Sequence, residues 1–253
     1  MKTILLTFSA FLTVISMAQT EGEVKYTTKI DMHAQLPEGE NTEMLKSMLP
    51  QYQEEKSTLL FTTEETLYKS GGTDESVEKQ ETDDDDNQVQ IKIEMSSPEE
   101  KIYTDVENGL VVQQRDLMDK IFLIKDTIDP AEWKITGETK MVSGLSCQKA
   151  TLESEENGVI EAWFTTQIPV SSGPAGLGGL PGLIVYVSMD DGNVTMTATQ
   201  IIPREIEKGE IEAPKKGKVV TREKYLELEQ KKMEQMKKQY GGDGDGNIIM
   251  ITE

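Results

Sequence analysis

Residues 162–187 constrain the fold more than any other stretch, because they predict a strand, an irregular turn and a second strand. Residues 162–168 are rich in β-branched and aromatic side chains that alternate between two faces. Pro169 and Pro174 fix φ and lack an N–H donor, so strand pairing should stop near them. Residues 183–187 form an apolar run that fits a strand buried on both faces. We therefore expect a β protein whose sheet is completed by a loop rich in glycine and proline.

Short runs of alternating apolar and polar residues extend through most of the chain, and tight-turn sequences separate many of them. The first predicted strand covers residues 23–32, and Asn108 followed by Gly109 is a strong hairpin signal. A short helix is expected over residues 42–49, whereas residues 71–87 are expected to form a loop. Roughly eight to ten strands follow from the spacing of these runs.

The predicted fold class is mainly β, with a curved antiparallel sheet that forms a half-barrel or incomplete barrel. One short helix belongs to the core, and a second, C-terminal helix follows it in the chain. The β domain is expected over residues 19–203. The remaining residues are predicted to form a linker (204–220), a charged helix (221–240) and a flexible tail rich in glycine and aspartate (241–253).

The N-terminus has the three parts of a secretory signal peptide. Met1 and Lys2 precede an apolar run too short for a comfortable membrane span, and small residues follow at Ser16 and Ala18. We expect residues 1–18 to be a signal peptide that is cleaved after Ala18. A retained N-terminal anchor is the alternative. No later apolar segment is long enough for a transmembrane span in the mature chain.

The net charge is −20, from 46 acidic and 26 basic residues. Such an acidic chain disfavours nucleic acid and anionic lipid surfaces as partners. It suits a soluble exported protein, or one that meets basic partners or divalent cations. Two acidic stretches, residues 83–86 and 243–247, lack the ligand spacing and the glycine turn of calcium loops. We therefore predict no metal site, with cation binding at these stretches left as the alternative.

The residues that most catalytic sites require are scarce. His33 is the one histidine, which excludes multi-histidine metal sites and weakens any Ser-His or Cys-His arrangement. Cys147 is the one cysteine, so no intrachain disulfide forms, and a buried, inert thiol is expected. Phosphate-binding and dinucleotide-binding fingerprints are absent from the sequence. We expect a protein without catalytic residues or cofactors, and therefore not an enzyme.

Residues 179–184 read Gly-Leu-Pro-Gly-Leu-Ile, and Trp133, residues 144–150 and residues 162–174 accompany them upstream. This set resembles the signature of the GLPGLI family, exported proteins typical of Bacteroidota, over about residues 26–203. The resemblance implies the β domain but carries over no catalytic residue, because that family is largely uncharacterised. A weaker resemblance is to periplasmic lipoprotein carriers, which implies a half-barrel around an apolar groove plugged by helices and a loop.

These observations predict a non-enzymatic exported binding protein of the cell envelope. It would hold a lipid-like, hydrophobic ligand or a protein partner in outer-membrane biogenesis or transport, in the periplasm, at the periplasmic face of the outer membrane, or at the cell surface. The residues predicted to line or gate an apolar groove are Trp163, Phe164, Leu180, Pro181, Gly182, Leu183 and Ile184. The alternative is an accessory subunit or scaffold of an outer-membrane protein complex, which binds through the acidic loop and the C-terminal tail. A metal-stabilised or hydrolytic protein is a third possibility.

Overall fold

The computed structural model describes residues 20–36, 39, 42–71, 74–82, 88–96, 99–117, 120–128, 131–154 and 158–240. The predicted signal peptide, the acidic stretch 83–86 and the tail 241–253 lie outside these residues. The β-strands are β1 (Gly22–Asp31), β2 (Tyr52–Phe61), β3 (Glu65–Ser70), β4 (Asp74–Thr82), β5 (Gln88–Ser96), β6 (Glu100–Asp105), β7 (Leu110–Leu117), β8 (Lys120–Thr127), β9 (Lys134–Val142), β10 (Leu145–Ser154), β11 (Gly158–Thr165), β12 (Leu183–Met189), β13 (Val194–Pro203) and β14 (Lys218–Val220). The α-helices are α1 (Thr42–Met48) and α2 (Arg222–Tyr240).

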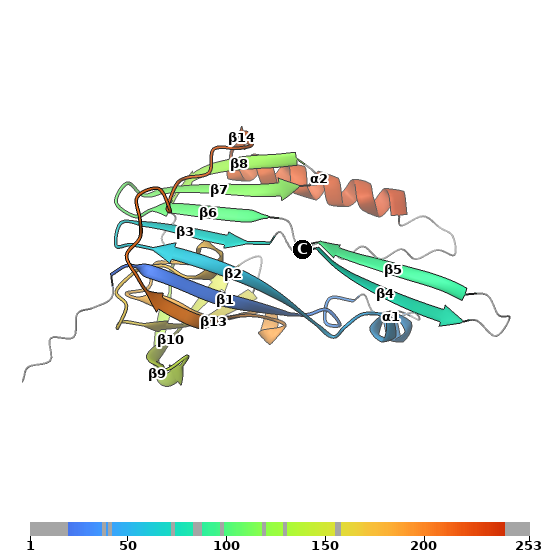
Figure 1. Ribbon diagram of the computed structural model, residues 1–253, viewed down its shortest axis with the longest axis horizontal. Helices are drawn as coiled ribbons and strands as arrows, with labels where there is room; N and C mark the ends of the chain where they lie inside the picture. Colours follow the sequence, from blue (N-terminus) through green and yellow to red (C-terminus); the bar gives the residue numbers. More distant parts are fainter. Residues whose placement is uncertain are drawn as a thin grey trace, which may run out of the picture.

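Twelve strands form one open sheet in the order β14-β8-β7-β6-β3-β2-β1-β13-β12-β11-β10-β9 (Figure 1). All neighbours in it are antiparallel except β14 and β8, which are parallel. The predicted fold class is confirmed: the protein is mainly β, its sheet is not closed, and a short early helix and a C-terminal helix accompany it. There are more strands than expected, partly because the predicted loop 71–87 was wrong. Residues 74–82 of that stretch form β4, which pairs with β5 in a separate hairpin beyond the large sheet (Figure 1).

One face of the sheet carries the largest hydrophobic cluster, and we call it the inner face. Val24, Leu59, Tyr68 and Ile102 lie opposite one another on β1, β2, β3 and β6, and all four are buried. Fully burying one aliphatic or aromatic side chain of this size contributes about 1.5–3 kcal/mol. A row across four strands therefore fixes their register, because a one-residue slip would move these side chains to the opposite face.

The predicted strand, irregular turn and strand of residues 162–187 are present as β11, the loop 166–182 and β12. The loop lies on the inner face, where Ile168 and Val170 join the hydrophobic cluster. The backbone N–H of Ile184 donates to the carbonyl of Ser172 at 2.9 Å. From the centre of the sheet, the buried Tyr26 hydroxyl donates to the Ile184 carbonyl at 2.7 Å. The loop is therefore a packed part of the core.

Residues 204–240, which we call the C-terminal strap, wrap around the β8 edge of the sheet (Figure 1). Ile211 and Ala213 pack on the outer face, against a cluster formed by Leu67, Tyr103, Val112 and Leu123. The strap then adds β14 to the edge of β8, and α2 packs on the inner face through Tyr225, against Phe122 and Ile124. Residues 204–220, predicted as an extended linker, are thus largely extended but held against the sheet.

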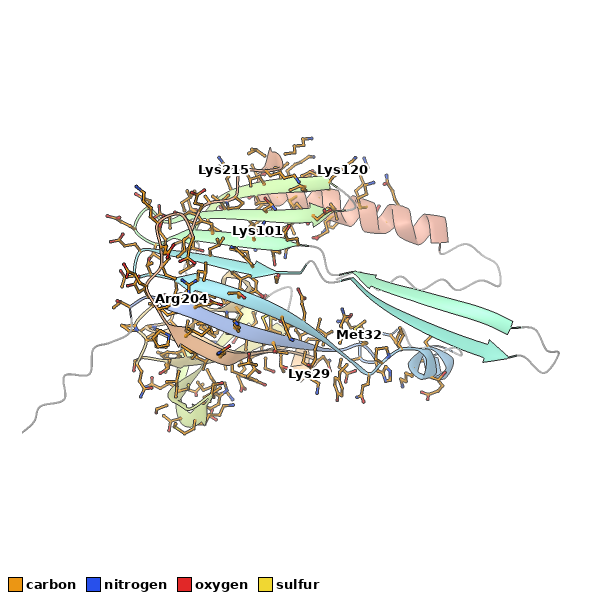
Figure 2. All side chains as sticks on the ribbon, in the orientation of Figure 1. Lys29, Met32, Lys101, Lys120, Arg204 and Lys215 are labelled. Atoms are coloured by element: carbon orange, nitrogen blue, oxygen red, sulfur yellow. The ribbon has the colours of Figure 1, made fainter. Side chains whose placement is uncertain are left out.

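Arg204 fixes the strap where it leaves β13 (Figure 2). Its guanidinium donates two 2.8 Å hydrogen bonds to Glu210 and a third, of 3.1 Å, to Glu23. The hydrogen bonds from Arg204, and then the backbone N–H of Glu207, lower the pKa of Glu210 from 4.5 to about 2. The folded chain therefore stabilises the ionised carboxylate of Glu210 more than the unfolded chain does.

This lowered pKa predicts a pH-dependent contribution to stability. Because the folded pKa lies below the unfolded one, the contribution is complete above about pH 4.5 and is lost as the pH falls toward 2. We expect Glu210→Gln to lower the melting temperature relative to wild type at pH 6, and the difference to shrink below pH 4.5. Glu212→Gln, which removes an exposed carboxylate from the same segment, is the control. A Glu210→Gln deficit that stays constant from pH 6 to pH 3 would contradict this account.

Candidate ligand-binding cavity

A cavity of about 560 Å³ lies on the inner face, between strands β6–β8, the loop 171–179 and the first residue of α2. This volume is within the usual range for small-molecule sites, about 300–1,000 Å³. The residues that surround it are Ile102, Thr104, Val106, Val111, Gln113, Ile124, Asp126, Thr127, Ile128, Ala131, Ser171, Ser172, Ala175, Gly176, Leu177, Gly178, Gly179 and Arg222. The cavity is therefore built from segments that are distant in the sequence and that the strap and the loop bring together.

The floor of the cavity alternates aliphatic and polar side chains across neighbouring strands. Strand register places Ile102, Gln113 and Ile124 in one row, and Thr104, Val111 and Asp126 in the next. Neighbouring strands are about 4.8 Å apart, and side chains on one face of a strand repeat about every 6.7 Å. A ligand that fits this floor has apolar and hydrogen-bonding groups spaced on the same scale.

Glycines shape the loop wall of the cavity. Gly176 has φ +73°, and a Cβ there would lie 3.1 Å from the side chain of Ile102. A Cβ on Gly178 would lie 2.9 Å from the carbonyl oxygen of Ser171. The Trp133 indole N–H donates to the Gly178 carbonyl at 2.8 Å, and the Ser171 hydroxyl accepts from the Gly179 N–H at 2.9 Å. These bonds and close contacts hold the wall at a defined distance from the floor.

Several polar side chains that face the cavity lack a protein partner. Within the described part of the chain, the side chains of Thr104, Gln113 and Arg222 make no hydrogen bond. Asp126 accepts a hydrogen bond from the N–H of Thr127 at 2.8 Å through one carboxylate oxygen. The cavity therefore offers both donors and acceptors to a ligand.

Two of the apolar side chains that line the cavity are exposed to solvent. Val106 and Ile128 are 40% and 38% exposed, although large aliphatic side chains are usually more buried. Val106 and Ile128 line the cavity, and the N–H of Ile128 donates to the carbonyl of Gly109 in the β6–β7 turn. These two side chains therefore form an apolar rim, which suits a ligand or partner with some hydrocarbon surface.

The residues predicted to line or gate a groove lie elsewhere in the structure, away from this cavity. Trp163 and Leu183 belong to the largest core cluster, and Phe164, Leu180 and Ile184 to a second one, all at least 95% buried. Gly182 is buried against the backbone of β11, and Pro181 is exposed. None of the seven lines the cavity. A core and a dry groove both require large apolar side chains, so composition alone did not distinguish them.

The sequence reasoning also missed residues that do line the cavity. Residues 171–179 belong to the stretch singled out from the sequence, but their small side chains gave no chemical signal. Arg222 was assigned to a charged helix without a site. The alternation of Thr104 with Ile102, and of Val111 with Gln113, was a usable signal, because it places a polar and an apolar residue on one strand face.

Cys147 is buried as predicted, and burial raises the pKa of its thiol, which disfavours the reactive thiolate. Across the described ranges, three or more His, Cys, Asp or Glu side chains are nowhere grouped so as to hold a metal ion. The same ranges contain no helix with the length and apolarity needed to cross a membrane.

Comparisons with known proteins place the chain in a different family from the one its hexapeptide suggested. The family model described as N-glycanase peptide, N-terminal domain, matches residues 78–236. The predicted membership in the GLPGLI family is therefore wrong. The weaker resemblance to lipoprotein carriers is not supported by the comparisons either. The misleading signal was local. Residues 179–184 lie where the loop joins β12, and Gly182 is required there because its backbone packs closely against Thr165 of β11.

Two solved structures share the fold. The structure of PNGF-II in the C2 space group aligns with a TM-score of 0.54 and 17% identity, and covers 84% of this chain. The structure of PNGF-II in the P21 space group aligns with a TM-score of 0.52 and 18% identity, and also covers 84% of this chain. This chain spans only 33% of each of those chains. A search of curated proteins found no match. With more than half of its residues matched by the family model, the chain belongs to the family of N-glycanase peptide N-terminal domains.

Proposed function

We propose that this chain is a non-enzymatic binding protein that holds a small ligand in the cavity between β6–β8 and the loop 171–179. The observation that carries the proposal is a preformed cavity in which the side chains of Thr104, Gln113 and Arg222 make no hydrogen bond within the described part of the chain. Thr104 and Gln113 are partly buried and Arg222 is exposed, so a ligand would replace the water at these side chains with its own hydrogen bonds.

The lining favours a ligand with mixed surface over a purely apolar one. An acyl chain alone would cover Ile102, Val111 and Ile124 but leave Thr104 and Gln113 unpaired. The family name, N-glycanase, describes an enzyme acting on N-glycans, and saccharides combine hydroxyl groups with apolar C–H faces. We therefore include both saccharides and amphipathic acyl compounds in the proposed ligand class. Export to the periplasm or to the periplasmic face of the outer membrane is part of the proposal, and rests on the predicted signal peptide.

A substitution that fills the cavity tests the proposal. Val111 lies at the centre of the floor, and Val111→Trp would place an indole in the space that a ligand requires. We expect the wild-type chain to bind N-decanoylglycinamide or di-N-acetylchitobiose by calorimetry. We expect Val111→Trp to weaken that binding at least tenfold, which corresponds to about 1.4 kcal/mol.

The matched control is Val159→Trp, because Val159 is 58% exposed on β11 and lies outside the cavity. This variant should bind as the wild type does. Equal binding by both tryptophan variants would contradict the cavity as the site. Failure of the wild type to bind either compound would favour the second candidate, a scaffold that binds proteins. The acidic net charge of −20 and the exposed apolar rim support that candidate.

A further inference from the structure

Within the described part of the chain, Arg222 forms no ion pair, unlike the other two arginines, Arg115 and Arg204. Arg115 forms an ion pair with Glu100 at 2.5 Å. Arg204 is held by Glu23 and Glu210. Among the described residues, the Arg222 guanidinium makes neither a hydrogen bond nor an ion pair, although the sequence has 46 acidic residues and only 26 basic ones.

The position of Arg222 is also unfavourable for helix stability. It is the first residue of α2, where the helix dipole disfavours a positive charge. The neighbouring Glu223 bonds its own backbone and Thr221, and these bonds, more than the attraction of Arg222, lower its pKa. Thr221 also caps the helix by accepting from the N–H of Lys224 at 3.3 Å. Arg222 is exposed, and it neither caps the helix nor forms an ion pair within the described residues, so its guanidinium is available to a ligand at the cavity.

Arg222 faces the same cavity as Asp126, yet no ion pair joins them. The cavity thus presents one positive and one negative group on separate parts of its lining, with aliphatic side chains between them. A carboxylate beside Arg222 would gain charge-assisted hydrogen bonds from its planar donor fork. Asp126 would disfavour a second negative charge and would accept a hydrogen bond from an amide or hydroxyl group.

We propose that Arg222 makes the cavity selective for a ligand that carries a single carboxylate on a body with aliphatic and hydrogen-bonding groups. The proposal rests on the proposed function, since it requires that the cavity hold a ligand. It goes further by naming the anionic group of that ligand and the residue that recognises it. An N-acylated amino acid has all three features.

A matched pair of compounds tests this inference on the full chain. N-Decanoylglycine and N-decanoylglycinamide share the acyl chain and the internal amide and differ at the terminal carboxylate. We expect the wild type to bind the acid at least tenfold more tightly than the amide, by calorimetry at pH 7. Arg222→Gln should remove this preference by weakening acid binding and leaving amide binding unchanged.

The control is Lys224→Gln, which removes the same unit charge from the same helix turn. Lys224 lies outside the cavity and pairs with Glu227, so its loss should leave the tenfold preference intact. Equal binding of acid and amide by the wild type would overturn the inference while leaving the proposed function standing. So would a preference that Arg222→Gln and Lys224→Gln change equally. If the wild type bound neither of the N-decanoyl compounds and did not bind di-N-acetylchitobiose, both proposals would be overturned.

Discussion

Replacing Gly182 by alanine is expected to destabilise the fold by about 3 kcal/mol or more, among the largest effects of any single methyl group in this chain. A Cβ at this position would lie 2.1 Å from the carbonyl oxygen of Thr165 and 2.7 Å from its carbonyl carbon. Both atoms belong to the backbone at the end of β11, so no side-chain rotation relieves the overlap. The loop would have to move away from β11, and the contacts of Leu180 and Leu183 with the core would loosen.

Chemical denaturation followed by fluorescence of the two tryptophans measures this effect. Gly39→Ala is the matched control, because a Cβ there meets nothing within 4 Å and the position does not require a positive φ. That variant should remain within about 0.5 kcal/mol of the wild type. If Gly182→Ala unfolds at the same denaturant concentration as Gly39→Ala, the close packing of the loop on β11 is incorrect.

Truncating Phe164 to alanine is expected to cost about 3–5 kcal/mol. Phe164 is completely buried on β11 and packs in one cluster with Leu180, Ile184 and Val187. Its loss would remove apolar surface from the interior and leave a void among residues of the loop and β12, which are held in place by their own hydrogen bonds. The loss of stability therefore includes the free energy of an unfilled void, because the neighbouring residues can close that void only in part.

Val159→Ala on the same strand is the comparison, since Val159 is 58% exposed. We expect a change within about 0.5 kcal/mol there, measured from the same denaturation curves. The Phe164→Ala result also separates two roles for this residue. A ligand gate would tolerate truncation with little loss of stability, whereas a core residue would not, so a loss below 1 kcal/mol would contradict the core assignment.

Much of the fold was predictable because its signals are local. The alternation of apolar and polar residues over 23–32 predicted β1. The prolines and glycines after residue 168 predicted that a loop follows β11. The strap was not predictable as packed structure. Ile211 and Ala213 lie among glutamates, lysines and prolines that are typical of a linker, and only the outer-face cluster of the distant strands β3 and β6–β8 explains their burial. Long-range partners of this kind leave no periodic pattern in the segment itself.

The site was harder to predict than the fold for a related reason. Large apolar side chains, which an apolar groove would need, are packed in the core instead, and Phe164 and Ile184 are examples. The cavity instead uses small loop residues and side chains from three strands and one helix, and Arg222 reaches it only because the strap wraps around the β8 edge. Similarly, Gly182 explains the hexapeptide that suggested the wrong family, because close backbone packing alone accounts for a glycine there.

Methyl NMR of the isoleucine and valine side chains tests the central claim most directly, because the cavity and the second core cluster contain different residues of these types. The account predicts that N-decanoylglycine shifts the methyl signals of Ile102, Val111, Ile124 and Ile128, which line the cavity. It predicts unchanged signals for Ile160 and Val187, which lie in the second core cluster. Shifts confined to Ile160 and Val187, or no shift at the four cavity residues with saturating compound, would contradict the claim that this chain holds a ligand between its loop and its sheet.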